Sequence, residues 1–275
     1  MEDLDLENYF LRIGYEGPRE VSFSVLSQIH QRQVRAIPYE NISVLLGQPI
    51  QIDLSSIHEK LIVQKRGGYC FELNRLMWMA LEKIGFVVKP LAARVFYRVP
   101  EGVVRPRTHM VLSVEIEGEQ YLIDPGFGGF SLPEPLRMKV GIEQNSSHGL
   151  YRLEAWQEEI SVMAKVQNEW QLLYRITFCE SLFQDFELPN WYLSTHPNSH
   201  FRERFLLARI ADEGRYTMLG LQSSFYPLKG ESRKQELKSV EEFFAVLKRD
   251  FLLEFHDPAN REALEFLVKK SLRSE

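Results

Sequence analysis

The hydrophobic pattern of this chain changes its period near residue 86, and this change constrains the fold more than any other feature of the sequence. Before that point apolar residues recur every three or four positions, which is typical of amphipathic helices. The clearest case is 70–85, where one apolar stripe ends at Gly85, a natural helix end. Asp53 is a plausible N-cap for another helix. The pattern predicts further helices over 6–15, 23–36 and 54–66.

After residue 86 apolar and polar residues alternate, as they do in strands with one buried face. Valine, isoleucine and aromatic residues are frequent in these runs, and Gly, Asn and Glu separate them. Such short strands in succession predict an antiparallel sheet or a small barrel. The strands expected before residue 190 are 86–99, 109–118, 119–126, 151–157, 159–167 and 169–178.

The last part of the chain mixes the two patterns. No internal repeat, Gly/Ser linker or low-complexity tract separates it from the rest. The sequence therefore predicts an α+β protein whose parts, 1–85, 86–190 and 191–275, pack as one unit. In the last part we expect strands over 205–214, 215–222 and 224–230, and helices over 239–255 and 258–274, the second with Pro258 near its start.

The charge of the chain argues against a general nucleic-acid-binding protein, because the net charge is −5 and the pI is near 5.9. One stretch is nevertheless basic, since Arg94, Arg98, Arg105 and Arg107 are accompanied by a single acid, Glu101. This patch is compatible with an anionic ligand, and a solvated hairpin is the alternative.

Several classes of protein are disfavoured by what the sequence lacks. It has no run of about 18 apolar residues, so we expect no membrane span. Its start, MEDLDLENYF, lacks the order of a signal peptide, so we expect a cytoplasmic protein. Only two cysteines are present, which excludes a disulfide scaffold. No CxxC or HExxH spacing occurs, so we expect no metal site.

The most informative window is RGGYCFELN, residues 66–74. Two glycines precede Cys70, which stands where the helix over 70–85 is expected to begin. A helix N-terminus offers unpaired N–H groups and partial positive charge, which lower a thiol pKa and can stabilise an oxyanion. Spacing alone leaves open that Cys70 is a buried structural cysteine. Cys179, in RITFCESLF, has none of these features, and we expect it in the core.

A catalytic cysteine needs a base and a group that orients the base. His109 stands at the start of an expected strand, and Asp124 ends the next one. Hairpin neighbours lie side by side, so the two side chains are expected to lie close together. The alternatives are a structural strand histidine and a turn-capping aspartate before Pro-Gly. Together with Cys70 the set matches the logic of a Cys-His-Asp triad.

The spacing of the three residues narrows the choice of enzyme class. A papain-like protease would place its histidine much further downstream of the cysteine. Transglutaminase-like enzymes have a similar order, with Cys, then His, then Asp, on a helix followed by a sheet.

At this point the sequence resembles the arylamine N-acetyltransferase family. RGGYCFELN resembles the active-site box, THMVLSV the histidine box and LIDPGFGGF the Asp-x-Gly-Phe-Gly box. Met110 stands where the family often has Asn. IPYEN, WYLSTHPNSHF and NYFLRIGYEG resemble further segments, in the same order, from about residue 8 to 201. Several ordered boxes are far more specific than any lone motif.

The resemblance implies a helical bundle over 1–85, a β-barrel over 86–190 and an α/β lid over 191–275. It also implies acetyl-CoA as acyl donor, ping-pong kinetics through acetyl-Cys70, and an arylamine, arylhydrazine or N-arylhydroxylamine as acceptor. We further expect no metal, no nucleic-acid or membrane partner, and a monomer or weak homo-oligomer. The site residues that the resemblance implies are an aromatic pocket of Tyr39, Phe127 and Phe201, and contacts to CoA from Thr108, Gly126, Gly128 and Gly129.

Several alternatives remain at this stage. Core aromatics and plain turns would explain the same pocket and CoA residues. Arg66 and Glu40 are expected to pair and to support the cysteine turn as structural residues. As a whole the chain could instead be an amide synthase that uses a carrier-protein thioester, a transglutaminase-like cysteine hydrolase or a non-catalytic binding module.

Overall fold

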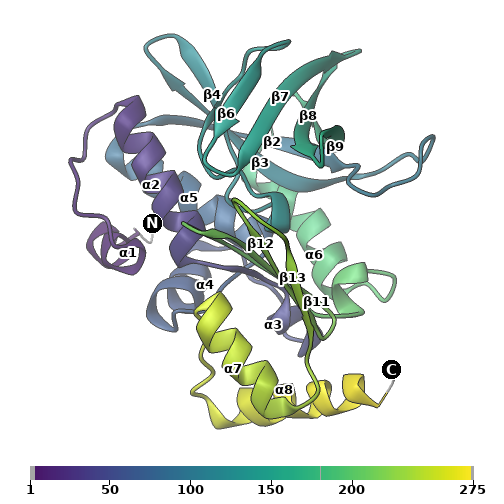
Figure 1. Ribbon diagram of the computed structural model, residues 1–275. Coiled ribbons are helices and arrows are strands. Elements are labelled where there is room, and N and C mark those ends of the chain that lie inside the picture. Colours follow the sequence, from purple (N-terminus) through teal and green to yellow (C-terminus); the bar gives the residue numbers. More distant parts are fainter. Residues whose placement is uncertain (1–3, 180, 274–275) are drawn as a thin grey trace.

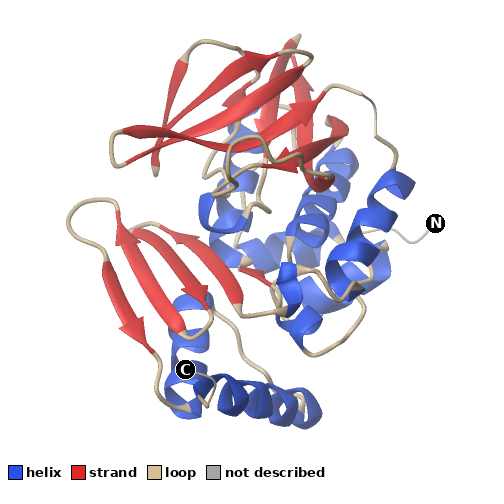
Figure 2. Ribbon diagram, turned by 90° about the vertical axis from the view of Figure 1, so that its right-hand side faces the viewer, coloured by secondary structure: helices blue, strands red, loops and turns tan. Residues whose placement is uncertain are grey.

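The computed structural model describes residues 4–179 and 181–273. The ends of the first and last expected regions, 1–3 and 274–275, lie outside the described residues. Five helices form the N-terminal part of the chain. In Figure 2 the helices near the end marked N lie next to both sheets. The five helices are α1 (Leu6–Ile13), α2 (Phe23–Ala36), α3 (Ile42–Leu45), α4 (Leu54–Ile57) and α5 (Cys70–Ile84).

Side-chain caps set the starts of several helices. The carboxylate of Asp5 accepts from the Asn8 N–H, and that of Asp53 from the Ser56 N–H, at 3.1 and 3.0 Å. The N-cap role expected for Asp53 is therefore confirmed. Gly85 ends α5 in the left-handed conformation, with φ of +112°.

The segment expected as one helix over 54–66 divides into two parts. After α4 the backbone widens into a π-helical turn, η1 (His58–Val63). Arg12 donates from Nε to the carbonyl of Leu61 at 2.9 Å. In an α-helix that carbonyl would accept from residue 65, so the arginine competes with regular helix geometry here.

The middle of the chain forms an eight-stranded antiparallel sheet in the order β5-β4-β3-β2-β9-β8-β7-β6. Its end strands are joined by the side chain of Gln144, which donates to the Arg137 carbonyl and accepts from the Arg137 N–H. The sheet is thus a nearly closed barrel, as expected. The strands are β2 (Val87–Val95), β3 (Arg107–Ile116), β4 (Glu119–Ile123), β5 (Leu136–Arg137), β6 (Glu143–Ser146), β7 (Gly149–Trp156), β8 (Glu159–Val166) and β9 (Glu169–Thr177).

The C-terminal part forms a second sheet, in the order β1-β10-β11-β12-β13, below the barrel in Figure 1. Its first strand comes from the N-terminal part, so the lid and the helices share one sheet and the three parts pack as one unit. The exact boundaries of the three regions remain a prediction. The elements are β1 (Tyr39–Glu40), β10 (Leu206–Ala211), β11 (Gly214–Leu219), β12 (Gln222–Pro227), β13 (Arg233–Glu236), α7 (Val240–Phe251) and α8 (Pro258–Leu272).

Helix α6 (Glu187–Thr195) links the barrel to the lid and was not expected from the sequence. Its signal is weak because Pro189 stands in its first turn and its buried face includes the polar residues Asn190 and Ser194. Both side chains are hydrogen-bonded to the backbone, Asn190 to Ile50 O and Ser194 to Asn190 O. One tertiary hydrogen bond, from Asn190, and one bond within the helix, from Ser194, therefore satisfy a buried polar face where an apolar stripe usually reveals a helix.

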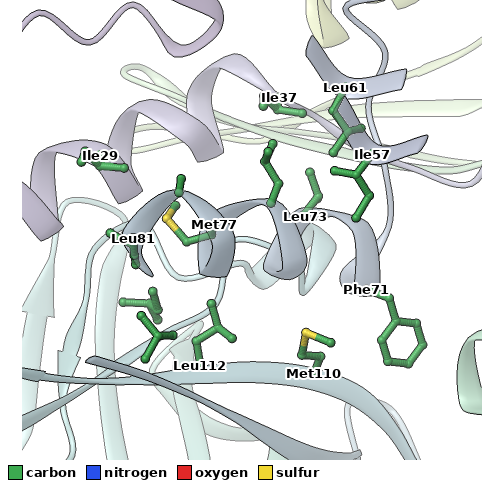
Figure 3. Packing of buried hydrophobic residues seen from close by; sticks show 14 of the residues in the cluster. Ile29, Ile37, Ile57, Leu61, Phe71, Leu73, Met77, Leu81, Met110 and Leu112 are labelled. Atoms are coloured by element: carbon green, nitrogen blue, oxygen red, sulfur yellow. The ribbon is translucent and has the colours of Figure 1, made fainter. Parts of the chain in front are cut away.

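Helix α5 is the central element, because it is covered on both sides. Leu76, Met77 and Leu81 are fully buried, and each such side chain contributes about 1.5–3 kcal/mol through burial. This packing fixes the position of Cys70 at the first residue of α5. Figure 3 shows the layers as Ile29 and Ile37 above α5, Leu73, Met77 and Leu81 on it, and Met110 and Leu112 of β3 below it.

Candidate active site

Cys70 is the first residue of α5, and only 4% of it is exposed. The turn before it is tight because of close backbone contacts. A Cβ on Gly67 would lie 2.4 Å from the Pro38 carbonyl, and one on Gly68 would lie 2.9 Å from the Cβ of Glu72. Only glycine fits at these two positions, which accounts for the RGG part of the window.

Two ion pairs hold the same turn; the first is buried, and in the second the lysine is partly exposed. Arg66 donates to Glu40 at 2.7 Å, which confirms the expected pair. Lys60 donates to Glu72 at 2.7 Å, and Glu72 also accepts from the Tyr69 N–H at 3.0 Å. The start of α5 is therefore held by the Arg66–Glu40 pair in the preceding segments and by the pair between Lys60 of η1 and Glu72 of α5.

His109 and Asp124 lie together, as the hairpin argument predicted. His109 Nε2 is 2.7 Å from Asp124 Oδ2, and 3% and 0% of these residues are exposed. Nδ1 is then the ring nitrogen left to exchange a proton with a nucleophile. Because His109 stands near the start of β3 and Asp124 follows β4, one local hairpin positions both side chains.

A β-bulge in β3 aims this strand at the cysteine. Ala93 of β2 pairs with His109, whereas Arg94 pairs with Arg107, so Thr108 is the extra residue. The Thr108 carbonyl lies 4.0 Å from Cys70 Sγ. The contact of Thr108 with the nucleophile is thus through its backbone, and its expected contact with CoA remains a prediction.

Asn74 is a contact residue of the triad that sequence reasoning missed. Its Nδ2 lies 3.1 Å from Asp124 Oδ1, 3.1 Å from Cys70 O and 2.9 Å from Met110 O. The spacing in the sequence could have revealed this contact, because a residue four positions after Cys70 lies on the same face of the helix. The Gly126 N–H also donates to Asp124 Oδ1, at 3.0 Å.

The thiol is less acidic than the helix N-terminus led us to expect. Burial raises the pKa of Cys70, and the negative charge of Asp124 raises it further. The N–H groups of Phe71 and Met110 act in the opposite direction, since they stabilise the sulfur anion. The predicted lowering of the thiol pKa was therefore wrong, because desolvation outweighs the helix end.

Tyr174 is a second residue that the sequence did not reveal. Its ring lies 5.2 Å from that of His109 and 4.9 Å from that of Phe127. Burial raises the pKa of Tyr174, and the charge of Asp124 adds to that effect. No motif marks it, because it lies on β9 and meets the site only through barrel closure.

The three aromatic residues expected in the acceptor pocket lie in different parts of the fold. Phe127 packs edge-on against His109, with ring centroids 5.2 Å apart. Phe201 packs edge-on against Tyr69, at 5.6 Å. The pKa of Tyr39 is raised by burial first and then by the charge of Cys70, so this phenol is electrostatically coupled to the nucleophile. Within the described residues no ring contact joins the three directly.

The glycines of the Asp-x-Gly-Phe-Gly box have local structural explanations. A Cβ on Gly126 would lie 2.5 Å from Asn74 Nδ2, so the site itself excludes a side chain there. Gly128 has φ of +75° and lies against the Tyr39 ring. The Gly129 carbonyl accepts from Arg215 of the lid at 3.3 Å. Their expected contacts with CoA remain a prediction.

Two other sequence expectations can be compared with the structure. Cys179 is exposed, so its assignment to the core was wrong. The strand-like run that contains it ends early, because β9 stops at Thr177. In the basic patch, Arg94 pairs with Glu159 at 3.3 Å, and the patch as an anion site remains a prediction.

A cleft of about 450 Å³ opens beside the ion-paired side of the turn, not beside the triad. Most of the residues that line it carry polar side chains, among them Lys60, Arg66, Glu72 and Gln64. In the described part of the chain, no group of three or more His, Cys, Asp or Glu side chains is suited to a metal ion. None of the helices within 4–179 and 181–273 combines the length and hydrophobicity that a membrane crossing requires.

Comparisons with known proteins agree with this geometry. The N-acetyltransferase family matches residues 22–259. The arylamine N-acetyltransferase of Escherichia coli is 35% identical over 253 residues, or 92% of this chain and 90% of the relative. That of Mycobacterium tuberculosis is 36% identical over 274 residues, or 98% and 96%. The Mycobacterium marinum enzyme in complex with CoA superposes with a TM-score of 0.93 at 32% identity, over 97% of this chain and 99% of that one. This chain therefore belongs to the arylamine N-acetyltransferase family.

Proposed function

We propose that this protein transfers an acetyl group from acetyl-CoA, through a thioester on Cys70, to an arylamine, an arylhydrazine or an N-arylhydroxylamine. The observation that carries the proposal is the 2.7 Å contact between His109 and Asp124, next to a cysteine at the first residue of a buried helix. Family membership supports the reaction, and the CoA named in the M. marinum structure supports the donor.

The first step creates the nucleophile. Asp124 accepts the Nε2 proton of His109 and fixes the tautomer in which Nδ1 is free to accept a proton. Moving the thiol proton to Nδ1 leaves the net charge of the site unchanged, so it avoids much of the cost of creating a lone buried thiolate. The N–H groups of Phe71 and Met110 then stabilise the sulfur anion.

Acyl transfer follows in two halves. The Cys70 sulfur attacks the acetyl carbonyl, the carbon–sulfur bond to CoA breaks, and the CoA sulfur leaves with the proton held by His109. In the second half the acceptor nitrogen attacks acetyl-Cys70 and loses its proton to His109. The carbon–sulfur bond breaks, and the Cys70 sulfur recovers that proton. Aromatic amines are weak bases, so they stay neutral and nucleophilic at neutral pH.

The binding residues are the less constrained part of the proposal. Tyr39, Phe127 and Phe201 suit an aromatic acceptor through stacking and apolar burial. Thr108, Gly126, Gly128 and Gly129 are proposed for CoA, because Thr108 borders the nucleophile and the glycine turn borders Asp124. Cytoplasmic location, monomeric or weakly oligomeric state and independence from metals also remain predictions.

The other functions considered from the sequence are less favoured. The curated relatives are named arylamine N-acetyltransferases, and one from Salmonella typhimurium is also named an N-hydroxyarylamine O-acetyltransferase. A hydrolase would use the same triad with water as the acceptor, and the released product distinguishes it. An amide synthase would use the same chemistry on a carrier-protein thioester. The acyl donor that the enzyme accepts therefore distinguishes an amide synthase from an acetyltransferase.

The direct test is acetylation of the protein by acetyl-CoA alone. We expect mass spectrometry of the intact protein and of its peptides to show one acetyl group on Cys70. Cys179→Ser is the matched control and should label as the unmodified protein does, because Cys179 is exposed and lies outside the site. Label on Cys179, or none at all, would contradict the proposal.

A second measurement tests the turnover. Adding an arylamine should release CoA and form the N-acetylated amine, and Cys70→Ser should abolish both because an alkoxide is far harder to generate than a thiolate. Release of acetate without acetylated amine would favour the hydrolase. Turnover with a carrier thioester but not with acetyl-CoA would favour the amide synthase.

A further inference from the structure

We infer that Asn74 is a positioning residue of the triad, whose side-chain amide holds the Asp124 carboxylate in the orientation that binds His109. The inference rests on the proposed function, because it concerns the base that activates Cys70. It assigns no contact between Asn74 and substrate. What it adds is a fourth side chain on which proton transfer depends.

The contacts of Asn74 join the three elements that carry the triad. Asn74 is fully buried on α5, and its Nδ2 donates to carbonyls on α5 and β3 and to the carboxylate that follows β4. The helix that carries the nucleophile and the hairpin that carries the base are thereby linked through one amide. A change at Asn74 alters the relation between the two, while each element keeps its own backbone hydrogen bonds.

The two oxygens of Asp124 have separate partners. Oδ1 accepts from Asn74 Nδ2 and from the Gly126 N–H, while Oδ2 faces His109 Nε2. With Oδ1 held twice, the carboxylate cannot rotate without losing bonds to a charged acceptor, which are stronger than neutral ones. The orientation of Oδ2, and with it the tautomer of His109, is therefore fixed from the far side of the carboxylate.

The orientation of the amide itself is also determined. If the amide were reversed, its carbonyl would face the two backbone carbonyls and the carboxylate, and all four groups are acceptors. In the observed orientation Asn74 Oδ1 is buried without a hydrogen-bond partner. A buried acceptor without a partner costs free energy, and the structure keeps it so that both N–H groups serve the site.

The experiment compares Asn74→Asp and Asn74→Leu with the unmodified protein, using the pH dependence of Cys70 alkylation by iodoacetamide and of its acetylation by acetyl-CoA. In Asn74→Asp two carboxyl groups face each other and share a proton. While the new carboxyl is protonated it donates to Asp124 as the amide does. Once it ionises, the donor is lost and like charges repel, so both rates should fall as pH rises through a range in which the unmodified protein stays active.

Asn74→Leu removes the donor at every pH. We expect acetylation of Cys70 to slow by about tenfold to a hundredfold, the effect of losing a hydrogen bond to a charged group. The slowing should show in the acetylation step more than in the apparent affinity for acetyl-CoA, because Asn74 contacts only protein groups of the site.

The matched control is Gln33, a second fully buried amide, which lies on α2 and packs against α5. It donates to Leu73 O at 2.9 Å and accepts from the Tyr9 hydroxyl at 2.8 Å, with no contact to the triad. Gln33→Glu and Gln33→Leu should lower thermal stability but leave the pH profile of Cys70 unchanged. This separates the loss of a buried amide that hydrogen-bonds to α5 from the loss of the bond to Asp124.

The inference is overturned if Asn74→Asp has the pH profile of Gln33→Glu, or if Asn74→Leu acetylates as fast as Gln33→Leu. If Asn74→Leu does not fold, Asn74→Asp decides alone, and failure of both to fold would show a structural role instead. The unmodified protein separates this test from the proposed function. If its Cys70 is not acetylated, the proposed function itself fails. If Cys70 is acetylated and the Asn74 variants match their controls, only the inference about Asn74 fails.

Discussion

The turn that carries Cys70 is buried on two sides, and the two sides are held by different forces. On one side, which we call the ion-pair side, Glu40–Arg66 and Lys60–Glu72 form pairs beside a polar cleft. The other, the triad side, has one carboxylate, Asp124, bound to a histidine, an amide and a backbone N–H.

The difference separates stability from chemistry. On the ion-pair side each charge lies beside an opposite charge, so these charges hold the turn in place and have no role in the proposed proton transfer. On the triad side the carboxylate of Asp124 has only neutral hydrogen-bond donors. It can therefore stabilise the imidazolium of His109 when the thiol proton of Cys70 moves to that ring. We therefore expect changes on the triad side to alter rates, and changes on the ion-pair side to alter unfolding.

The largest expected effect on rate comes from Asp124→Asn. The amide cannot stabilise an imidazolium and favours the wrong histidine tautomer, so acetylation of Cys70 in folded protein should slow by about 10⁴-fold. Single-turnover acetylation, normalised to folded protein, measures this. A loss of less than tenfold would show that the carboxylate is structural. The triad side would then stabilise the turn as the ion-pair side does, with no separate role in the reaction.

The next effect is on stability and comes from Arg66→Met. This change leaves Glu40 buried without its partner, which should destabilise the fold by about 3–5 kcal/mol. The double variant Glu40→Gln/Arg66→Met should recover part of that loss, because no lone charge remains. Denaturant unfolding of the single and double variants tests this, and equal losses in both would show that the pair contributes packing alone.

The smallest effect is a contrast in pH dependence between the two glutamates of the ion-pair side. Burial acts to raise the pKa of Glu40, but the charges of Arg66 and Lys60 and hydrogen bonds lower it overall. Burial raises the pKa of Glu72, and Lys60 does not fully offset it. Glu40 thus contributes stability above pH 4.5, the ordinary glutamate value, that is lost as pH falls.

Glu72 has the opposite sign. Its folded state binds the proton more tightly than the unfolded state, so its contribution weakens as pH rises above 4.5. Glu72→Gln should therefore gain stability relative to the unmodified protein as pH rises above 4.5, whereas Glu40→Gln should lose stability relative to it as pH rises toward 4.5 from below. Unfolding free energies at a series of pH values provide the measurement. The same slope for both variants would contradict the opposite pKa directions.

Much of the fold was predictable because its elements are locally encoded. The apolar period identified α2 and α5, and the alternation identified the long barrel strands. The proximity of His109 and Asp124 was also predictable, because a hairpin joins residues that are near in sequence. Helix α6 and the π-helical turn η1 were not, because buried polar side chains and Arg12 determine them.

The sequence by itself determined where the chemistry stands: a cysteine at a helix start, a histidine near a strand start and an aspartate after the next strand. These positions follow from local periodicity and turn chemistry, which need no long-range contact. Only the tertiary structure decided how that chemistry is tuned. The pKa of Cys70, the exposure of Cys179 and the contacts of Asn74 and Tyr174 depend on burial and charge among segments far apart in the chain, and desolvation acts only once those segments have packed.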